Sequence, residues 1–273
     1  MSFYTSLSGL KNAQTGLSVT ANNIANAETL GFKKSRTLFS DLVVGDSPKM
    51  QQGIGSTVQS ITQNFGMGPI EQTGGALDMA ITGDGFFAVK NPATSDVSYT
   101  RNGAFTVDDS GFVKDGSGNR LQIFTPTQNP ATDLPVDCQL PSQSTPPVTT
   151  PPTPASPFAG VSVGLDGSVK VSYADGTNET IGSVALATFP AVDGLKQTGS
   201  SNWVASGVSG AAEYGLPGST SLGSVKSGSI ERSNVDITEE LVGLITMQRY
   251  FQANAKAIDT ATQISQTVLN LRT

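Results

Sequence analysis

The C-terminal stretch of this chain, Asn234 to Thr273, decides its fold: NVDITEELVGLITMQRYFQANAKAIDTATQISQTVLNLRT. It contains no proline, and its only glycine is Gly243. Asp236 followed three residues later by Glu239 is a capping-box pattern, in which each side chain accepts a hydrogen bond from a backbone N–H at the start of a helix. The stretch therefore predicts a helix of roughly 50 Å, which is too long for an ordinary compact domain to bury alone.

Apolar residues recur at heptad spacing along this predicted helix, as expected of a helix that packs against another helix. The main row is Ile237, Leu244, Phe251 and Ile258, and the row beside it is Leu241, Gln248 and Ala255. After a small shift of phase the pattern continues through Ala261, Ile264, Val268 and Leu271.

The N-terminal segment repeats this pattern and supplies a partner within the chain. Its main row is Phe3, Leu10, Leu17 and Ile24, and its companion row is Leu7, Gln14 and Ala21. We expect a helix from about residue 3 to about residue 28, ending before Gly31, because glycine favours the residue after a helix end. Leu10, Leu17 and Ile24 should then face Leu244, Phe251 and Ile258 in a coiled coil.

Both predicted helices carry few charges on their remaining faces. Between Ser2 and Leu30 the only charged residues are Lys11 and Glu28, whereas a solvated helix normally carries interspersed charge pairs. One interpretation is a coil within one chain that has a neutral polar surface. The other is that further subunits surround the helices. On the second interpretation the assembly interface comprises Leu7, Leu10, Leu17, Ala21, Ile24, Leu241, Leu244, Phe251, Ala255, Ile258, Val268 and Leu271.

The composition excludes several classes of function. A net charge of −6 and a pI near 4.6 argue against nucleic-acid binding, which requires a basic surface. The chain has no histidine and one cysteine, Cys138, so the usual nucleophilic machinery, zinc ligands and disulfides are missing. We expect no enzyme activity, no cofactor and no metal. The N-terminus lacks the pattern of a cleaved signal peptide, and no stretch is apolar enough for membrane insertion.

The middle of the chain reads as β structure. We place terminal helical regions at 1–31 and 235–273, a connector with strand segments at 32–73, and an antiparallel β domain at 74–234. The fold class is therefore α+β and multidomain. In the connector, Lys33, Lys34 and Arg36 predict a solvated basic turn, and Thr57 to Phe65 alternates like a strand. Hairpin turns are predicted at Asp84-Gly85, Asp166-Gly167 (type I′) and Asp175-Gly176.

Two segments of the middle region do not have the pattern of a strand. The run at 140–158, LPSQSTPPVTTPPTPASPF, is rich in proline and predicts an extended surface excursion. The run at 108–119, DDSGFVKDGSGN, superficially suggests a calcium site through Asp108, Asp109, Asp115 and Asn119. Its spacing does not match a calcium-binding loop, and acidic residues beside glycine are also what β-turns require.

Several stretches together resemble the axial proteins of the bacterial flagellum, the rod and hook family. They are ANNIANAETLGFK at 21–33, GALDMAITGDGFF at 75–87, YTRNGAF at 99–105, and SNVDITEEL at 233–241 followed by QRYFQAN at 248–254. They occur in the family's order over nearly the whole chain. Within the family, residues 60–65 and the chain end at 268–272 look more like the hook protein than the distal rod protein.

The resemblance implies a subunit of a helical polymer around a channel, with an inner tube of paired terminal helices and an outer β domain. It implies a homopolymer that meets rod proteins, hook-filament junction proteins, a cap and the flagellum's own type III export apparatus. One departure is that hook proteins usually carry a further outer β domain mid-chain, near the proline-rich run, and this chain's length is closer to that of a rod protein. A distal rod subunit and a secreted β-domain adhesin or binding module remain the alternatives.

Overall fold

The computed structural model describes residues 2–44, 52–130, 132–143, 156–219 and 221–270. These residues form two compact units. The helical unit contains residues 1–27, 33–64 and 235–273, and the β unit contains residues 28–32 and 65–234. Terminal helices combined with a mainly antiparallel β domain make the fold α+β, as the sequence predicted.

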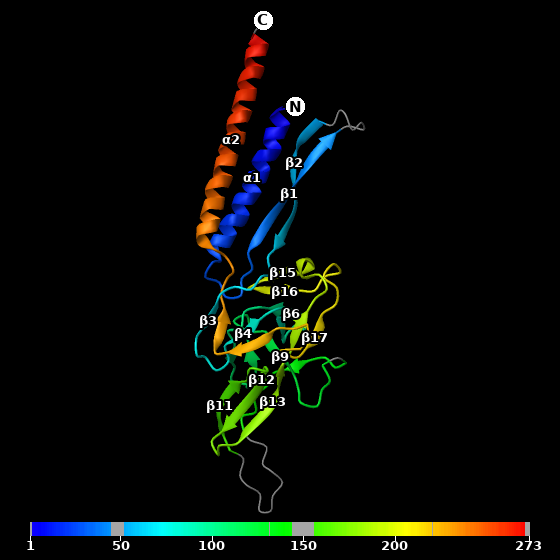
Figure 1. Ribbon diagram of the computed structural model, residues 1–273, viewed down its shortest axis with the longest axis vertical. Helices are drawn as coiled ribbons and strands as arrows, with labels where there is room; N and C mark the ends of the chain where they lie inside the picture. Colours follow the sequence, from blue (N-terminus) through cyan, green and yellow to red (C-terminus); the bar gives the residue numbers. More distant parts are fainter. Residues whose placement is uncertain (1, 45–51, 131, 144–155, 220, 271–273) are drawn as a thin grey trace, which may run out of the picture. The chain divides into compact units, whose positions relative to one another are not determined.

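Two helices form the frame of the helical unit and lie side by side (Figure 1). They are α1, Ser2–Ala25, and α2, Ile237–Asn270. Asp236 caps α2, because its Oδ1 accepts hydrogen bonds from the backbone N–H of Thr238 at 2.8 Å and of Glu239 at 3.2 Å. The predicted helix start is therefore confirmed. The first helix ends about three residues earlier than predicted, and turns follow it up to Gly31, which has a φ of 65°.

A long β-hairpin packs along α1 and belongs to the same unit. Its strands are β1, Ser35–Val44, and β2, Gln52–Gln63, paired antiparallel with irregularities at Leu38/Phe39 and Leu42/Val43. The strand predicted at 57–65 thus overlaps β2. The observed strand begins earlier, at Gln52, and it pairs with β1, a strand that the sequence did not predict. Hydrogen bonds of 2.7 Å from Asn12 to Ser56 and 3.4 Å from the Ser56 N–H to Ser8 join the hairpin to α1.

The β unit is built around one large antiparallel sheet. Its strand order is β11 (Phe158–Val163), β12 (Ser168–Tyr173), β13 (Asn178–Val184), β9 (Arg120–Phe124), β5 (Phe86–Lys90), β6 (Val97–Thr100), β16 (Asn202–Val204) and β15 (Lys196–Gly199). Branching from it are β7 (Thr106–Val107), β8 (Val113–Lys114), β10 (Val136–Asp137), β14 (Leu186–Thr188) and β17 (Glu213–Gly215). The 3₁₀ helix η1 spans Val192–Gly194.

Two small strand pairs complete this unit. β3 (Ile70–Gln72) pairs with β19 (Ser229–Glu231), and β4 (Met79–Thr82) pairs with β18 (Ser224–Ser227). The hairpin predicted at Asp84-Gly85 is therefore wrong, because β4 and β5 on either side of it belong to different sheets. The hairpins at Asp166-Gly167 and Asp175-Gly176 are confirmed. The first turn is not type I′, since Gly167 has a positive φ and Asp166 does not.

The hydrophobic core of the chain lies in the β unit. One cluster surrounds Met79, Phe87, Leu121, Val171 and Leu186, and Cys138 is buried within it. A second cluster is mainly aromatic and consists of Phe86, Ala88, Tyr99, Ala187, Phe189 and Trp203. Phe65 packs edge-on against Phe86 and Trp203, which ties the start of the β unit to this second cluster.

The basic turn at 33–36 and the proline-rich run at 140–158 were both predicted to lie at the surface. The solvated basic turn is wrong for Lys33, which is fully buried, and Lys34 is ion-paired to Glu239 and Glu240. Arg36 alone is exposed. The proline-rich run falls largely at 144–155, outside the described residues, and its flanks meet at the bridge between Gln143 and Pro157.

Gly103 offers a test of the β unit's packing. A Cβ at this position would lie 1.5 Å from the carbonyl oxygen of Met79, which is backbone and cannot swing away. We expect Gly103→Ala to destabilise the chain by about 3 kcal/mol, because the backbone at residue 103 and the start of β4 must move apart. In thermal unfolding this should lower Tm by roughly 5–10 °C.

Gly116→Ala is the matched control, because a Cβ there meets no atom within 4 Å and its φ is not positive. Its Tm should change by no more than about 2 °C. Equal shifts in the two variants would contradict the packing described here.

Candidate assembly surface on the terminal helices

Three contacts, seven residues apart on each helix, set the pairing of α1 with α2. A Cβ added to Gly9 would lie 2.6 Å from Oδ1 of Asn254, and one added to Gly16 would lie 3.0 Å from Sδ of Met247. Asn23 donates a hydrogen bond of 3.1 Å from Nδ2 to Oε2 of Glu240. The helices therefore run antiparallel with a constant register, as in a coiled coil.

Small residues on α1 make this close approach possible. Ala13 and Gly16 are buried, and Gly9 is half-buried. On α2 a row of buried or half-buried positions recurs at spacings of three and four residues, which is the heptad pattern. They are Glu240, Leu244, Met247, Phe251, Asn254, Ile258 and Ala261.

The predicted interface residues differ in burial, and some of them belong to this contact row. Half-buried are Leu7, Leu10, Leu17, Ile24, Leu244, Phe251, Ala255 and Ile258. Ala21, Leu241 and Val268 are exposed, and Leu271 lies outside the described residues. Leu244, Phe251 and Ile258 thus belong to the contact row, whereas on α1 the row passes through Gly9, Gly16 and Asn23. The sequence contained this signal, since Gly9, Gly16 and Asn23 are themselves spaced by seven.

A polar cluster at the start of α2, here called the base cluster, fixes the register. It consists of Asn23, Lys34, the backbone of Ser35, and Glu240. Asn23 donates to the Ser35 carbonyl at 2.9 Å and accepts from the Ser35 N–H at 2.9 Å. Lys34 lies 2.9 Å from Oε1 of Glu240, whose side chain is only 7% exposed. One buried carboxylate of α2 therefore contacts both α1 and Lys34, the residue before β1.

The charge state of Lys34 depends on this cluster. Burial lowers its pKa, but hydrogen bonds to Glu240 and Glu239 and their negative charges outweigh that effect. The net result is a pKa above the ordinary value of 10.5. Glu239 contributes from the solvent side, because its side chain is 71% exposed.

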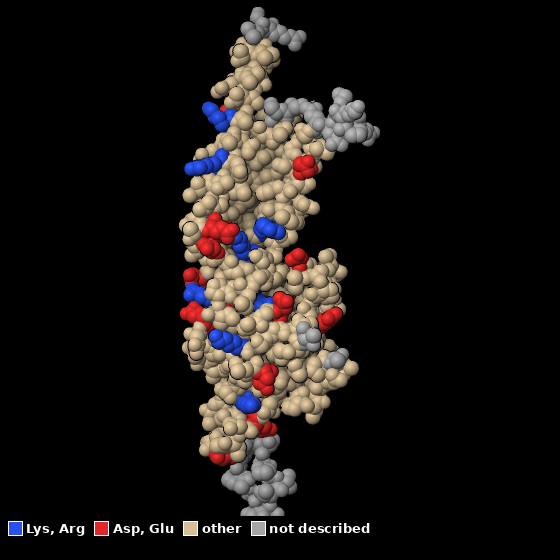
Figure 2. All heavy atoms as spheres, in the orientation of Figure 1, with Lys and Arg blue, Asp and Glu red and all other residues tan. Residues whose placement is uncertain are grey.

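The outer faces of the terminal helices carry large exposed apolar side chains among neutral polar ones, with few charges. The exposed large side chains on them include Tyr4, Leu241, Val242, Tyr250 and Val268. On the face shown in Figure 2, few charged side chains lie over the terminal helices and the hairpin. Groups of exposed apolar side chains are typical of a protein–protein interface.

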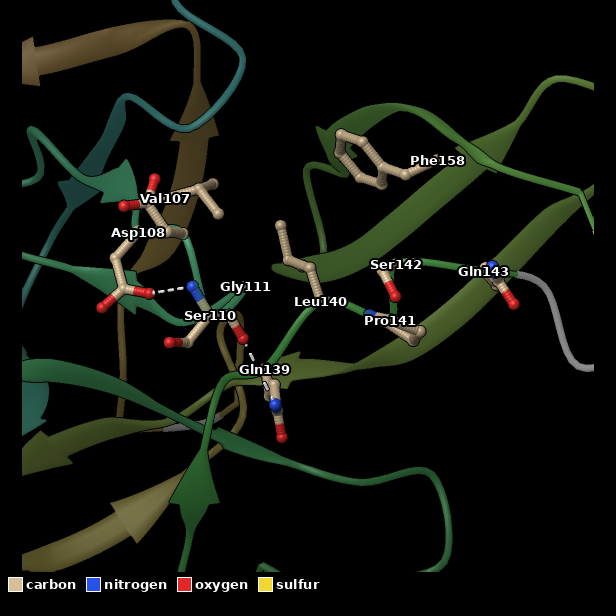
Figure 3. A pocket seen from close by; sticks show the side chains of 11 residues that line it. Val107, Asp108, Ser110, Gly111, Gln139, Leu140, Pro141, Ser142, Gln143 and Phe158 are labelled. Atoms are coloured by element: carbon tan, nitrogen blue, oxygen red, sulfur yellow. Dashed lines mark hydrogen bonds between the residues drawn. The ribbon is translucent and has the colours of Figure 1, made fainter.

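An open pocket in the β unit offers a contrasting candidate site (Figure 3). It has a volume of about 610 Å³ and lies between the turn at 107–111 and the segment at 139–143, with Phe158 across from them. Asp108 accepts a hydrogen bond from the Ser110 N–H, and Gln139 donates to the Ser110 carbonyl. These groups stabilise the turn.

Asp115 likewise serves a turn. Its carboxylate accepts hydrogen bonds from the N–H groups of Ser117 and Asn119 at 2.8 and 2.9 Å and from the side chain of Asn119 at 3.0 Å. In the described ranges, no group of three or more His, Cys, Asp or Glu side chains is placed to hold a metal ion. Nor is any helix in those ranges both long and apolar enough to cross a membrane.

Known proteins resemble the chain along its whole length. Residues 3–33 match the family described as "Flagella basal body rod protein", residues 80–171 match "Flagellar hook protein FlgE/F/G D1 domain", and residues 226–271 match "Flagellar basal body rod FlgEFG protein C-terminal". The flagellar basal-body rod protein FlgG of Bacillus subtilis is 36% identical, over 99% of this chain and 98% of that protein. The chain belongs to the rod and hook family of flagellar axial proteins.

Two further relatives define the family's range. FlgG of Caulobacter vibrioides is 30% identical over 98% of both chains. The flagellar hook protein FlgE of Salmonella typhimurium is 26% identical over the full length of both chains. That alignment spans 408 positions although this chain has 273 residues, so the Salmonella hook protein has a long stretch without a counterpart here.

The family matches coincide with the elements described above. The first covers all of α1 but Ser2 together with the turns after it, the second lies within the β unit, and the third includes all of α2. As a member of the rod and hook family, the chain is a structural component of the flagellum. The exposed apolar faces of α1 and α2 belong to two of the three matched segments.

Removing Glu240 tests the base cluster. Glu240→Ala would leave Asn23 and Lys34 without their buried acceptor, and we expect a loss of about 2 kcal/mol in the free energy of unfolding. Urea denaturation followed by helical circular dichroism measures it. Glu239→Ala removes an exposed partner of the same lysine and should cost at most about 1 kcal/mol. If Glu239→Ala were the more damaging of the two, the base cluster would not set the register.

Alkaline pH provides a second test of the cluster. Because the Lys34 pKa is raised by folding, its contribution to stability is complete below the unfolded pKa and is lost as the pH rises through the folded pKa. The difference in stability between the natural protein and Lys34→Met should therefore be constant up to about pH 10 and shrink above it. Denaturant midpoints at a series of pH values measure this difference. A difference that grows with pH would contradict the assignment.

Proposed function

We propose that the chain is a self-assembling subunit of a helical tube in the flagellum, with its terminal helices forming the inner wall around an export channel. The observation that carries the proposal is the missing core of the helical unit. Among its described residues Ala13 is the only buried apolar side chain, whereas the β unit holds two hydrophobic clusters. A unit with so little buried apolar surface gains its stability from contact with other subunits.

The flagellar hook is the tube that we assign to this subunit. Residues 60–65 and 268–272 resemble the hook protein, and a hook transmits the torque of the motor to the filament while it bends. Small neutral side chains at helix interfaces allow neighbouring subunits to shift without separating charge pairs. In a hook the chain would contact copies of itself, rod proteins below and hook-filament junction proteins above, with a cap protein present during assembly.

The distal rod is the second candidate, and a specific observation favours it. The relatives named FlgG align with this chain almost end to end, whereas the hook protein of Salmonella is much longer. In either position the subunit would be exported through the flagellum's own type III apparatus and would need no catalytic residue.

A secreted adhesin with a functional β unit is the alternative from a different class. On that interpretation the terminal helices are dispensable, so a variant lacking residues 2–25 would keep its binding activity. A tube subunit lacking α1 would remain a soluble monomer, because α2 would lose its partner helix. Electron microscopy of the assembled natural protein separates the two flagellar candidates, since a hook is curved and a rod is straight.

Charges placed on the terminal helices test the assembly directly. Leu17→Asp and Ala255→Glu each put a carboxylate on a helix face that the proposal buries between subunits, and desolvating it is unfavourable. We expect the critical concentration for tube formation to rise at least about tenfold, which corresponds to roughly 1.4 kcal/mol. Sedimentation and electron microscopy after salting-out measure it.

Leu165→Asp is the matched control, because Leu165 is 77% exposed on a turn of the β unit. It should assemble like the natural protein. Tubes formed equally well by Leu17→Asp and Ala255→Glu would show that these helix faces are not the interface.

A further inference from the structure

The contact row of α2 continues past the point where α1 begins. It runs through Asn254, Ile258 and Ala261, and the same heptad spacing then places Ser265 and Val268 in the row. α1 starts at Ser2, opposite the region of Ala261 in the observed register. Residues 262–270 therefore form a C-terminal overhang, in which α2 extends past the start of α1 and has only Phe3 of the described part of α1 beside its first turns.

The overhang has the chemistry of an unfilled helix interface. An open groove of about 460 Å³ lies at its start, between Phe3 of α1 and the α2 residues from Ala261 to Leu269. Ile264, Val268 and Leu269 are 60%, 61% and 65% exposed. There is no charged residue from Thr260 to Asn270, so an apolar partner would meet no ion that had to be desolvated.

A second patch of the same kind lies at the opposite end of α2. This base patch consists of Leu241, Val242 and Ile245, which are 46%, 61% and 49% exposed. No charged residue occurs from Leu241 to Gln248, and the exposed Glu239 and Arg249 flank the patch one helical turn away. Leu241 and Ile245 are four residues apart, as are Ile264 and Val268, so each pair presents two apolar side chains on one face of the helix.

Building on the proposed function, we infer that the C-terminal overhang of one copy binds the base patch of α2 in a second copy. The overhang continues an interface that this chain already uses for helix packing, and both surfaces are apolar and uncharged. The two patches are different surfaces of one molecule, so their contact is head-to-tail. Repeated head-to-tail contacts generate an open helical polymer, whereas a patch that binds its own counterpart closes into a dimer.

The size of the overhang agrees with a contact that forms only within a polymer. Nine residues of helix extend about 14 Å, which is far less than an interface of about 1,000 Å² or more requires for a specific pair of proteins. The free subunit should therefore remain monomeric at low concentration. Contacts with several neighbours at once make the joint stable in the tube.

Cysteine pairs test the contact. In tubes of a Leu241→Cys/Val268→Cys double variant, a short bis-maleimide should link successive copies and give a ladder of dimers, trimers and longer chains after denaturation. Each single variant should stay monomeric, because its cysteine faces a patch without one. Cys138 does not interfere, since it is fully buried and burial raises its pKa to about 12. Leu165→Cys/Val268→Cys is the matched control and should give no ladder.

Opposite charges provide a second test that does not depend on crosslinking. Ile245→Glu and Val268→Lys should each raise the critical concentration at least about tenfold, and the double variant should recover most of that loss because its two charges meet across the joint. Recovery in the double variant would support the head-to-tail contact. No recovery, with each single variant defective, would overturn it.

The outcomes separate this inference from the proposed function. If natural tubes form but the double-cysteine tubes give no ladder, the subunit polymerises through other surfaces and the inference is wrong. Dimers from Val268→Cys alone would show that the overhang binds itself, which also overturns it. If the natural protein forms no tubes under any condition that assembles other axial proteins, the proposed function fails first.

Discussion

The hydrogen-bonded contact of Glu240 with Asn23 and Lys34 is the constraint on which the helical unit depends. Coiled-coil rows of small and apolar residues tolerate shifts by one heptad, because each step presents a similar surface. A buried carboxylate does not, since any shift would leave it without its donors. Glu240 meets both donors in only one register, and that register also seats Asn254 and Met247 against Gly9 and Gly16.

This arrangement changes the meaning of the sparse charge on α1. Part of its neutral polar surface is used within the chain, because Ser8, Asn12 and Asn23 bond to the hairpin or to the residues leading into it. A Cβ at Gly55 would lie 2.4 Å from Oγ of Ser8, so the hairpin approaches α1 closely. The hairpin therefore satisfies these three polar residues of α1. Assembly is better supported by α2, whose exposed apolar side chains have no such partner in the described part of the chain.

The sequence was sufficient for what is local and periodic, and insufficient for what depends on distant pairing. Heptad spacing located both helices, and Asp236 marked the start of α2. The contact row on α1 was predicted one residue away from its true position, because large side chains were favoured over Gly9 and Gly16. Asp84-Gly85 resembles a hairpin turn, but β4, the strand before it, pairs with β18, which lies far along the chain. Lys33 resembles a solvated lysine in the sequence, yet it is fully buried.

The two units also differ in how they obtain their stability. The β unit buries two clusters of its own and so holds its shape before and after polymerisation. In its described part the helical unit buries Ala13 and a few polar groups. Its stability therefore comes from the pairing of its helices and from contacts made by its outer faces. Polymerisation that relies on the helical unit is then coupled to ordering of that unit, because an isolated amphipathic helix gains little on its own. Such coupling makes growth at an existing tube end more favourable than the start of a new tube, since a tube end already offers the apolar surface that orders the next subunit.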